Sequence, residues 1–120
     1  MEPSKYSSNI ISFNENSLNS TAKINYLEVK KAAAILRAIN HKLRQSIIKL
    51  LEERSNLTVT EIYVKLRVEQ SVASQHLAIL RRAEIVKTTR EGKNIHYNLN
   101  AARLEEVNTF VKDLLSEEDG

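Results

Sequence analysis

The chain has 120 residues, enough for one domain with a single core, and no apolar run approaches the roughly 18 residues that span a bilayer. Charged residues make up 28% and cysteine is absent, which is ordinary for a globular protein and excludes disulfides, thiolate metal sites and cysteine-based redox sensing. The net charge of +3 is compatible with nucleic-acid binding, and because the N-terminus lacks the features of a signal peptide we expect a cytoplasmic protein without membrane contact.

The two ends of the chain are predicted to lie outside the folded domain. Half of the first twenty residues are Ser or Asn, without apolar periodicity, so residues 1–22 are predicted to form a flexible N-terminal arm. Residues 117–120 form an acidic C-terminal tail. This places one domain at residues 23–116.

Two helices are predicted to begin this domain. Apolar residues from Ala32 to Ile39 have the i, i+3, i+4, i+7 spacing of one helical face, which predicts a helix over about 24–39. Asn40 is a candidate N-cap for a second helix, whose apolar positions recur at helical spacing to about Arg54.

Two shorter helices follow. Thr58 or Thr60 can cap a helix that ends near Leu66, and a break at "RVEQ" leads to a helix with the sequence "SVASQHLAILRR", Ser71–Arg82. Two short helices joined by about four residues suggest a helix-turn-helix.

After Ala83 the apolar period changes from 3.6 to 2. Ile95, Tyr97 and Leu99 alternate with polar residues, and "IVKTTR" before them is a β-prone run of similar length. Between the two runs, "EGKN" contains Gly92, which tolerates the positive φ of a tight turn. A β-hairpin with charged residues at its tip is therefore predicted.

The last predicted helix carries a regular apolar seam. Its residues, spaced 3, 4 and 3, are Leu104, Val107, Val111 and Leu114. Such spacing is typical of a coiled-coil seam, although a helix that closes its own core has a similar pattern; we favour dimerisation. Charge also separates along the chain, with six basic and no acidic residues from Lys30 to Lys49, and six acidic residues against Lys112 alone from Leu104 to Gly120.

The helix at Ser71–Arg82 has two chemically different faces. Rotation by about 100° per residue places Ala73, Leu77 and Leu80 on one side. The opposite side carries Ser71, Ser74, Gln75, Ala78, Arg81 and Arg82. Small residues permit close approach, Ser and Gln can hydrogen-bond base edges and Arg reaches phosphates, so this face suits the DNA major groove. A solvated helix face is the alternative.

His76 falls between these faces. The helical wheel points it partly inward, which favours a packed or hydrogen-bonded histidine over one that reads bases. Ser74 and His76 are two residues apart and do not face each other on a helix, and no nearby carboxylate could orient the imidazole. We therefore expect no catalytic residues, no cofactor and no enzyme activity.

The hairpin strengthens the prediction of DNA binding. A helix-turn-helix followed by a two-stranded wing with Lys87, Arg90 and Lys93 has the element order of a winged helix, whose wing can lie against a phosphate backbone. The predicted fold is mainly α with a small β-hairpin, in the order α-α-α-α-β-β-α.

From about Ala38 to Leu99 the chain resembles the ArsR/SmtB-type winged-helix repressors of bacteria. "AINHKLRQSIIKLL" is similar to the family's second helix, with Arg44 at its characteristic arginine, and "QSVASQHLAILRRAEIVKTTREGKNIHYNL" is similar to its recognition helix and wing. Glu84 departs from the family, which usually has glycine before the first strand.

The resemblance implies a homodimer joined through the first and last helices, which binds a double-stranded operator with imperfect two-fold symmetry and releases it to an inducer. The expected DNA-binding residues are Gln70, Ser71, Ser74, Gln75, His76, Arg81, Arg82, Lys87, Arg90 and Lys93. The expected dimer interface comprises Leu27, Ile35, Leu104, Val107, Val111 and Leu114. Whether an effector exists, and whether it is a small molecule or a protein, stays open.

The family's metal-ligand motifs are missing. Thr58 and Thr60 stand where its thiolates would be, and hydroxyls are poor substitutes for thiolates. The zinc-type positions of the last helix correspond to Ala101, Arg103, Leu114 and Glu117, of which only the glutamate could bind a metal. We expect no metal site and a DNA-binding regulator, most simply a repressor; the alternative is a winged-helix module that binds another protein and not DNA.

Overall fold

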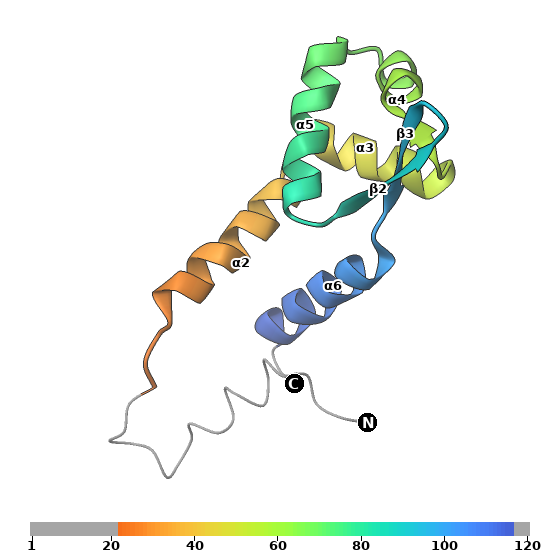
Figure 1. Ribbon diagram of the computed structural model, residues 1–120. Coiled ribbons are helices and arrows are strands. Elements are labelled where there is room, and N and C mark those ends of the chain that lie inside the picture. Colours follow the sequence, from red (N-terminus) through yellow and green to blue (C-terminus); the bar gives the residue numbers. More distant parts are fainter. Residues whose placement is uncertain (1–21, 117–120) are drawn as a thin grey trace.

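The computed structural model describes residues 22–116 (Figure 1). Its helices are α2 (Tyr26–Ile39), α3 (Lys42–Glu53), α4 (Val59–Leu66), α5 (Gln70–Arg82) and α6 (Ala101–Leu115). Its strands are β1 (Leu57–Thr58), β2 (Val86–Glu91) and β3 (Asn94–Leu99). The predicted mainly helical winged helix-turn-helix is confirmed. The predicted arm, except for residue 22, and the predicted tail lie outside the described residues.

The junction between α2 and α3 corrects one predicted cap. Asn40 is the C-cap of α2, because its backbone N–H still donates to the Leu36 carbonyl at 2.9 Å. The N-cap of α3 is His41, whose Nδ1 accepts a hydrogen bond from the Leu43 N–H at 3.1 Å. The prediction of Asn40 as N-cap was wrong because the chain makes this turn one residue later than the usual capping preference indicates.

The start of α4 follows a capping box. The Thr58 hydroxyl accepts from the Glu61 N–H at 3.2 Å, and the Glu61 carboxylate accepts from the Thr58 N–H at 2.9 Å. At its other end Arg67 takes a left-handed conformation with φ 60°, which stops the helix and begins the turn to α5. The helix-turn-helix is thus fixed locally at both ends of α4.

The wing is an antiparallel hairpin whose register runs from Val86 opposite Leu99 to Glu91 opposite Asn94. Gly92, with φ 66°, lies in the two-residue turn, as its conformational freedom predicts. The sequence did not predict β1, which pairs with β3 and makes the sheet three-stranded. A strand of two residues is too short to have a period of its own.

The corner before β2 accommodates the departure at Glu84. Glu84 adopts φ 62°, the left-handed region that favours glycine. Its N–H donates to the Arg81 carbonyl at 2.9 Å, and its carboxylate pairs with Arg103 of α6 at 3.2 Å. The chain therefore makes the turn that a glycine would make, held by a backbone hydrogen bond and an ion pair.

The core lies where α3, α4, α5 and the start of β2 meet. Its buried residues are Ile47, Leu50, Leu51, Ile62, Leu77, Leu80, Ile85 and Val86. Within the described part of the chain no helix has the length and apolar character needed to cross a membrane. The inner face of α5 is thus packed in the core, and the outer face of α5 stays exposed.

Helices α2 and α6 extend away from this core (Figure 1). No residue of α6 is fully buried, and in α2 only Ala38 is. Near the far ends of the two helices, apolar side chains are exposed: Leu27 by 60% and Leu114 by 58%. These two helices therefore leave much of their apolar surface uncovered within one chain.

Candidate nucleic-acid interface

The inner face of α5 is anchored in the core and the outer face is open. Ala73, Leu77 and Leu80 are each at most 1% exposed. The residues exposed on the outer face are Gln70, Ser71, Ser74, Gln75, Ala78, Arg81 and Arg82. The helix therefore has the two faces that its sequence predicts, and the outer one is free of large apolar side chains.

The distribution of charge along α5 favours contact with an anionic partner. Its first turn has no acidic residue, and Glu69 at the N-cap makes no side-chain capping hydrogen bond. The backbone N–H groups and the positive end of the helix dipole therefore remain available to a phosphate or a base edge at this end. At the other end Arg81 and Arg82 add two full positive charges.

His76 is held by side chains of the α2–α3 junction. The Arg44 guanidinium donates from Nη1 to His76 Nδ1 at 3.1 Å, and also donates from Nε to the Ala38 carbonyl and from Nη2 to the Arg37 carbonyl, at 2.6 and 3.1 Å. The His41 ring lies 4.7 Å from that of His76, centroid to centroid. Arg44 thus ties α5 to the end of α2.

This arrangement defines the protonation state of His76. Arginine can only donate hydrogen bonds, so His76 Nδ1 accepts and its proton is on Nε2. Burial of the imidazole lowers the pKa of His76, and the neighbouring His41 and Arg44 lower it further. The neutral imidazole is therefore the form that the folded chain prefers.

Acid should destabilise the folded chain through His76. Because its pKa is lower in the folded state than the ordinary 6.5, the unfolded chain binds more protons below pH 6.5, and the His76 contribution to stability is lost as pH falls through the folded pKa. We expect the free energy of unfolding to fall from pH 7.5 to pH 5 by less in His76→Gln than in wild type. Urea unfolding at both pH values measures this, and an identical fall in both proteins would contradict it.

The wing brings its basic residues to the surface beside α5. Lys87, Arg90 and Lys93 are exposed on the hairpin. A hollow of about 450 Å³ lies between the helix and the wing, lined by Ser74 and Arg81 from α5 and by Tyr97 from β3. The outer face of α5 and the sheet thus border the same hollow.

A polar cluster holds the wing to the loop before β1. Asn56 and Asn98 exchange two hydrogen bonds, of 2.8 and 3.1 Å, and Asn56 Nδ2 donates to Glu91 at 3.2 Å. His96 Nδ1 donates to the Asn56 carbonyl at 3.2 Å. Sequence reasoning missed this cluster because its partners lie 35–42 residues apart along the chain; the only local signal was the polar break "RSN".

Two of the positions that correspond to metal ligands in the family have other roles in this structure. Thr58 caps α4, and Arg103 pairs with Glu84 and Glu106. Glu117 lies outside the described residues. Between residues 22 and 116, no group of three or more His, Cys, Asp or Glu side chains could hold a metal ion.

The sequence of the chain is similar to those of known bacterial transcriptional regulators. Residues 41–88 match the model of the family described as bacterial regulatory protein, arsR family. The chain is 33% identical over 85 residues to the transcriptional repressor PagR of Bacillus anthracis, a match that covers 71% of the chain and 85% of PagR. It is also 35% identical over 74 residues to the transcriptional activator HlyU of Vibrio cholerae, which covers 62% of the chain and 68% of HlyU.

Solved structures have the same fold. The crystal structure of PagR superimposes with a TM-score of 0.59 and 30% identity, covering 72% of this chain and 99% of that one. A homodimeric winged helix-turn-helix DNA-binding domain from Mycobacterium bovis gives a TM-score of 0.64 at 18% identity, covering 86% and 98% of the two chains.

Proposed function

Because the chain belongs to the arsR family of bacterial regulatory proteins, we propose that it is a sequence-specific DNA-binding transcriptional regulator that acts as a homodimeric repressor. The observation that carries this proposal is the outer face of α5, which is small, polar and basic while its inner face is locked in the core. Within residues 22–116 we identify neither a catalytic constellation nor a feature that favours a protein-binding module that leaves DNA alone.

In this proposal the position of each residue on α5 or on the wing decides whether it contacts bases or phosphates. Ser71, Ser74 and Gln75 reach base edges from the first two turns of α5, whereas Gln70 lies at its start. Phosphates are contacted by Arg81, Arg82, Lys87, Arg90 and Lys93. His76 supports the helix through its hydrogen bond to Arg44 and reaches DNA only at the edge of the contact.

We assign dimerisation to the outer parts of α2 and α6. Of the residues expected there, Ile35, Leu104 and Val107 pack against their own core. Leu27 and Leu114 are more than half exposed, which supports contact with a second copy of the chain. The homodimeric relative of the same fold supports this assembly, which would present two α5 helices to a two-fold symmetric operator.

Repression is favoured over activation because more of the similar proteins are named repressors: PagR, SdpR of Bacillus subtilis and the biofilm growth-associated repressor of Agrobacterium fabrum, against the activator HlyU. We further propose that the protein is not an enzyme and works without a metal or cofactor in the cytoplasm, and that its effector is a small molecule or a protein.

DNA binding is tested with the DNA upstream of the gene itself, because repressors of this type often control their neighbours. We expect saturable binding in fluorescence anisotropy, weakened steeply by salt because phosphate contacts release counterions, and much weaker binding to a scrambled sequence of equal length. Equal affinity for the two sequences, or no binding to either, would reject the proposal. A reporter fused to the bound promoter then separates repression from activation.

Alanine substitution of a residue that contacts a base should affect DNA affinity differently from substitution of a residue that contacts a phosphate. Gln75→Ala should cost about 1–3 kcal/mol on the operator and little on scrambled DNA, because a base contact is lost. Arg90→Ala should weaken binding to both sequences alike and lower the salt dependence, because a phosphate contact is lost. Anisotropy titrations of both variants on both sequences check this; an equal loss on both sequences for Gln75→Ala would remove its role in specificity.

A further inference from the structure

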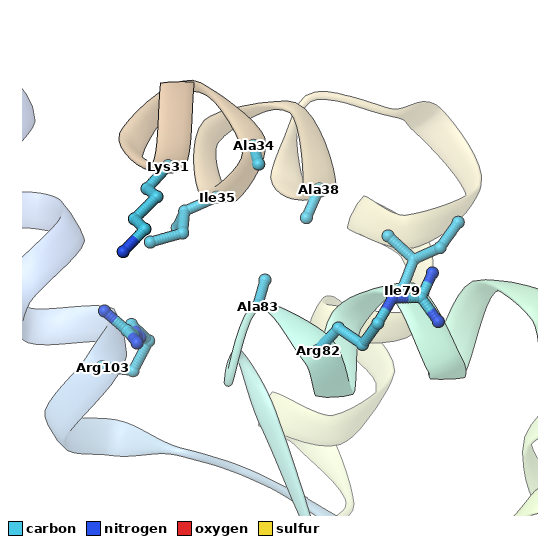
Figure 2. A pocket seen from close by; sticks show the side chains of 8 residues that line it. All are labelled: Lys31, Ala34, Ile35, Ala38, Ile79, Arg82, Ala83 and Arg103. Atoms are coloured by element: carbon cyan, nitrogen blue, oxygen red, sulfur yellow. The ribbon is translucent and has the colours of Figure 1, made fainter. Parts of the chain in front are cut away.

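A pocket of about 400 Å³ lies on the side of the molecule where α2, the end of α5 and the start of α6 meet (Figure 2). Its volume falls within the roughly 300–1,000 Å³ typical of small-molecule sites. Its apolar wall includes Ile35 from α2 and Ile79 and Ala83 from the end of α5. The pocket is therefore large enough to accept an apolar group against this wall.

The charged residues that line this pocket are all basic: Lys31, Arg82 and Arg103. Figure 2 shows the Lys31 ammonium and the Arg103 guanidinium directed toward each other across the opening, from α2 and α6. Lys31 and Arg82 form no ion pair among the described residues, whereas Arg103 pairs with Glu84 and Glu106, which do not line the pocket. Of the three cations that line the pocket, Lys31 and Arg82 therefore carry positive charge that no carboxylate of the described residues pairs with.

Arg103 also has an unused hydrogen-bond donor. Its Nη2 and Nη1 atoms lie 3.2 and 3.3 Å from carboxylate oxygens, but its Nε is buried and has no hydrogen-bond partner. Buried donors are satisfied in most proteins, because an unpaired one loses its interaction with water. An anionic oxygen in the pocket would place a charge opposite to that of Lys31 beside the Arg103 guanidinium.

From this combination we propose that the pocket binds an amphipathic anion, a molecule with one carboxylate or phosphate headgroup and an apolar body, and that this ligand regulates DNA binding. The headgroup lies between Lys31 and Arg103, and the apolar body lies against Ile35 and Ala83. Recognition requires both parts, since the charges alone would bind inorganic anions and the apolar wall alone would bind alcohols.

The position of the pocket links it to the DNA-binding surface. Arg82 lines this pocket and also the hollow between α5 and the wing. We infer that the anionic headgroup attracts the unpaired Arg82 guanidinium into the pocket, so that an occupied pocket withdraws Arg82 from DNA and lowers operator affinity. This regulatory step rests on the proposed function, whereas binding of the anion does not.

Binding is tested first without DNA, by following backbone amide NMR signals during titration with octanoate and octyl phosphate. We expect saturable shifts at Ala34, Ala83 and their neighbours, with a dissociation constant below about 1 mM for at least one of the two. Acetate, inorganic phosphate and 1-octanol, each with one half of the ligand chemistry, should bind at least tenfold more weakly. If neither octyl anion gives saturable shifts at these amides, or 1-octanol binds equally well, the proposal is wrong.

Two neighbouring lysines provide a matched pair of variants. Lys31→Gln should weaken octyl anion binding about tenfold because it removes a cation at the headgroup, and Arg103→Gln should do the same. Lys30→Gln removes the same charge from an exposed position outside the pocket and should leave binding unchanged. Equal weakening by Lys30→Gln and Lys31→Gln would indicate general surface electrostatics and overturn the site.

Regulation is measured separately, with operator DNA and the full chain. The octyl anion that binds should lower operator affinity in wild type and Lys30→Gln, and have little effect in Lys31→Gln, whose DNA binding without ligand should equal that of wild type. Anion binding without any change in operator affinity would reject the regulatory step and retain the site. Absence of operator binding without ligand would instead be a failure of the proposed function.

Discussion

Leu114→Glu is expected to convert the protein from a dimer to a monomer and to lower operator affinity by at least about 30-fold. In one chain Leu114 is 58% exposed, so the charge does not disturb the fold of the chain itself. In the proposed dimer the same carboxylate would be buried without a partner, which costs roughly 2–5 kcal/mol at an interface. Loss of the dimer then separates the two α5 helices that bind one operator.

Thr109→Glu is the matched control for this change. Thr109 lies on α6, is exposed, and falls on the opposite side of the helix from the seam at Leu104–Leu114. It adds the same negative charge, so any general repulsion from DNA affects both variants. Sedimentation velocity gives the oligomeric state and anisotropy the operator affinity; a dimeric Leu114→Glu protein would place the interface elsewhere.

Arg44→Ala is expected to lower the free energy of unfolding by about 2–4 kcal/mol. Its guanidinium makes three hydrogen bonds, to the Ala38 and Arg37 carbonyls and to His76. Each is worth about 1 kcal/mol net, and the two that are partly buried leave acceptors unsatisfied when the guanidinium is removed. Because these bonds join the end of α2 to α5, operator binding should weaken as well.

Arg37→Ala is the control, because the Arg37 side chain is exposed and only its backbone carbonyl takes part in the cluster. It should change the free energy of unfolding by about 0.5 kcal/mol or less. Arg44→Lys should restore only part of the stability, since a point charge cannot reproduce the planar donor geometry. Urea unfolding at fixed protein concentration measures all three, and equal losses for Arg44→Ala and Arg37→Ala would refute the role of the cluster.

Secondary structure was predicted well where the sequence repeats a pattern over several turns. The two faces of α5 were predicted directly because each residue's burial depends on its position along one element. The strand β3 was also predicted, but its burial does not alternate: Ile95 is exposed, and His96 and Asn98 are half-buried like Tyr97 and Leu99. The cap of α3 and the strand β1 were missed, because a cap depends on one turn of backbone and β1 exists only through its pairing with β3.

The candidate site was likewise predicted in part: features that depend on local sequence were found, and contacts between distant segments were not. Exposure of the polar and basic residues of α5 and the wing followed from periodicity and turn chemistry. The hydrogen bond between Arg44 and His76 did not, because its partners are 32 residues apart. Nor could the sequence bring Lys31, Arg82 and Arg103 to one pocket, since they lie on three helices.

By itself, the sequence determined the order of the helices and of the two wing strands, the faces of α5 and the absence of cysteine chemistry, because these depend on local spacing and composition. Only the tertiary structure decided that His76 accepts a hydrogen bond from Arg44, that Asn56 holds the wing, and that three cations border one apolar pocket. Such contacts form when packing of the core brings distant segments together, and that packing is a property of the whole chain.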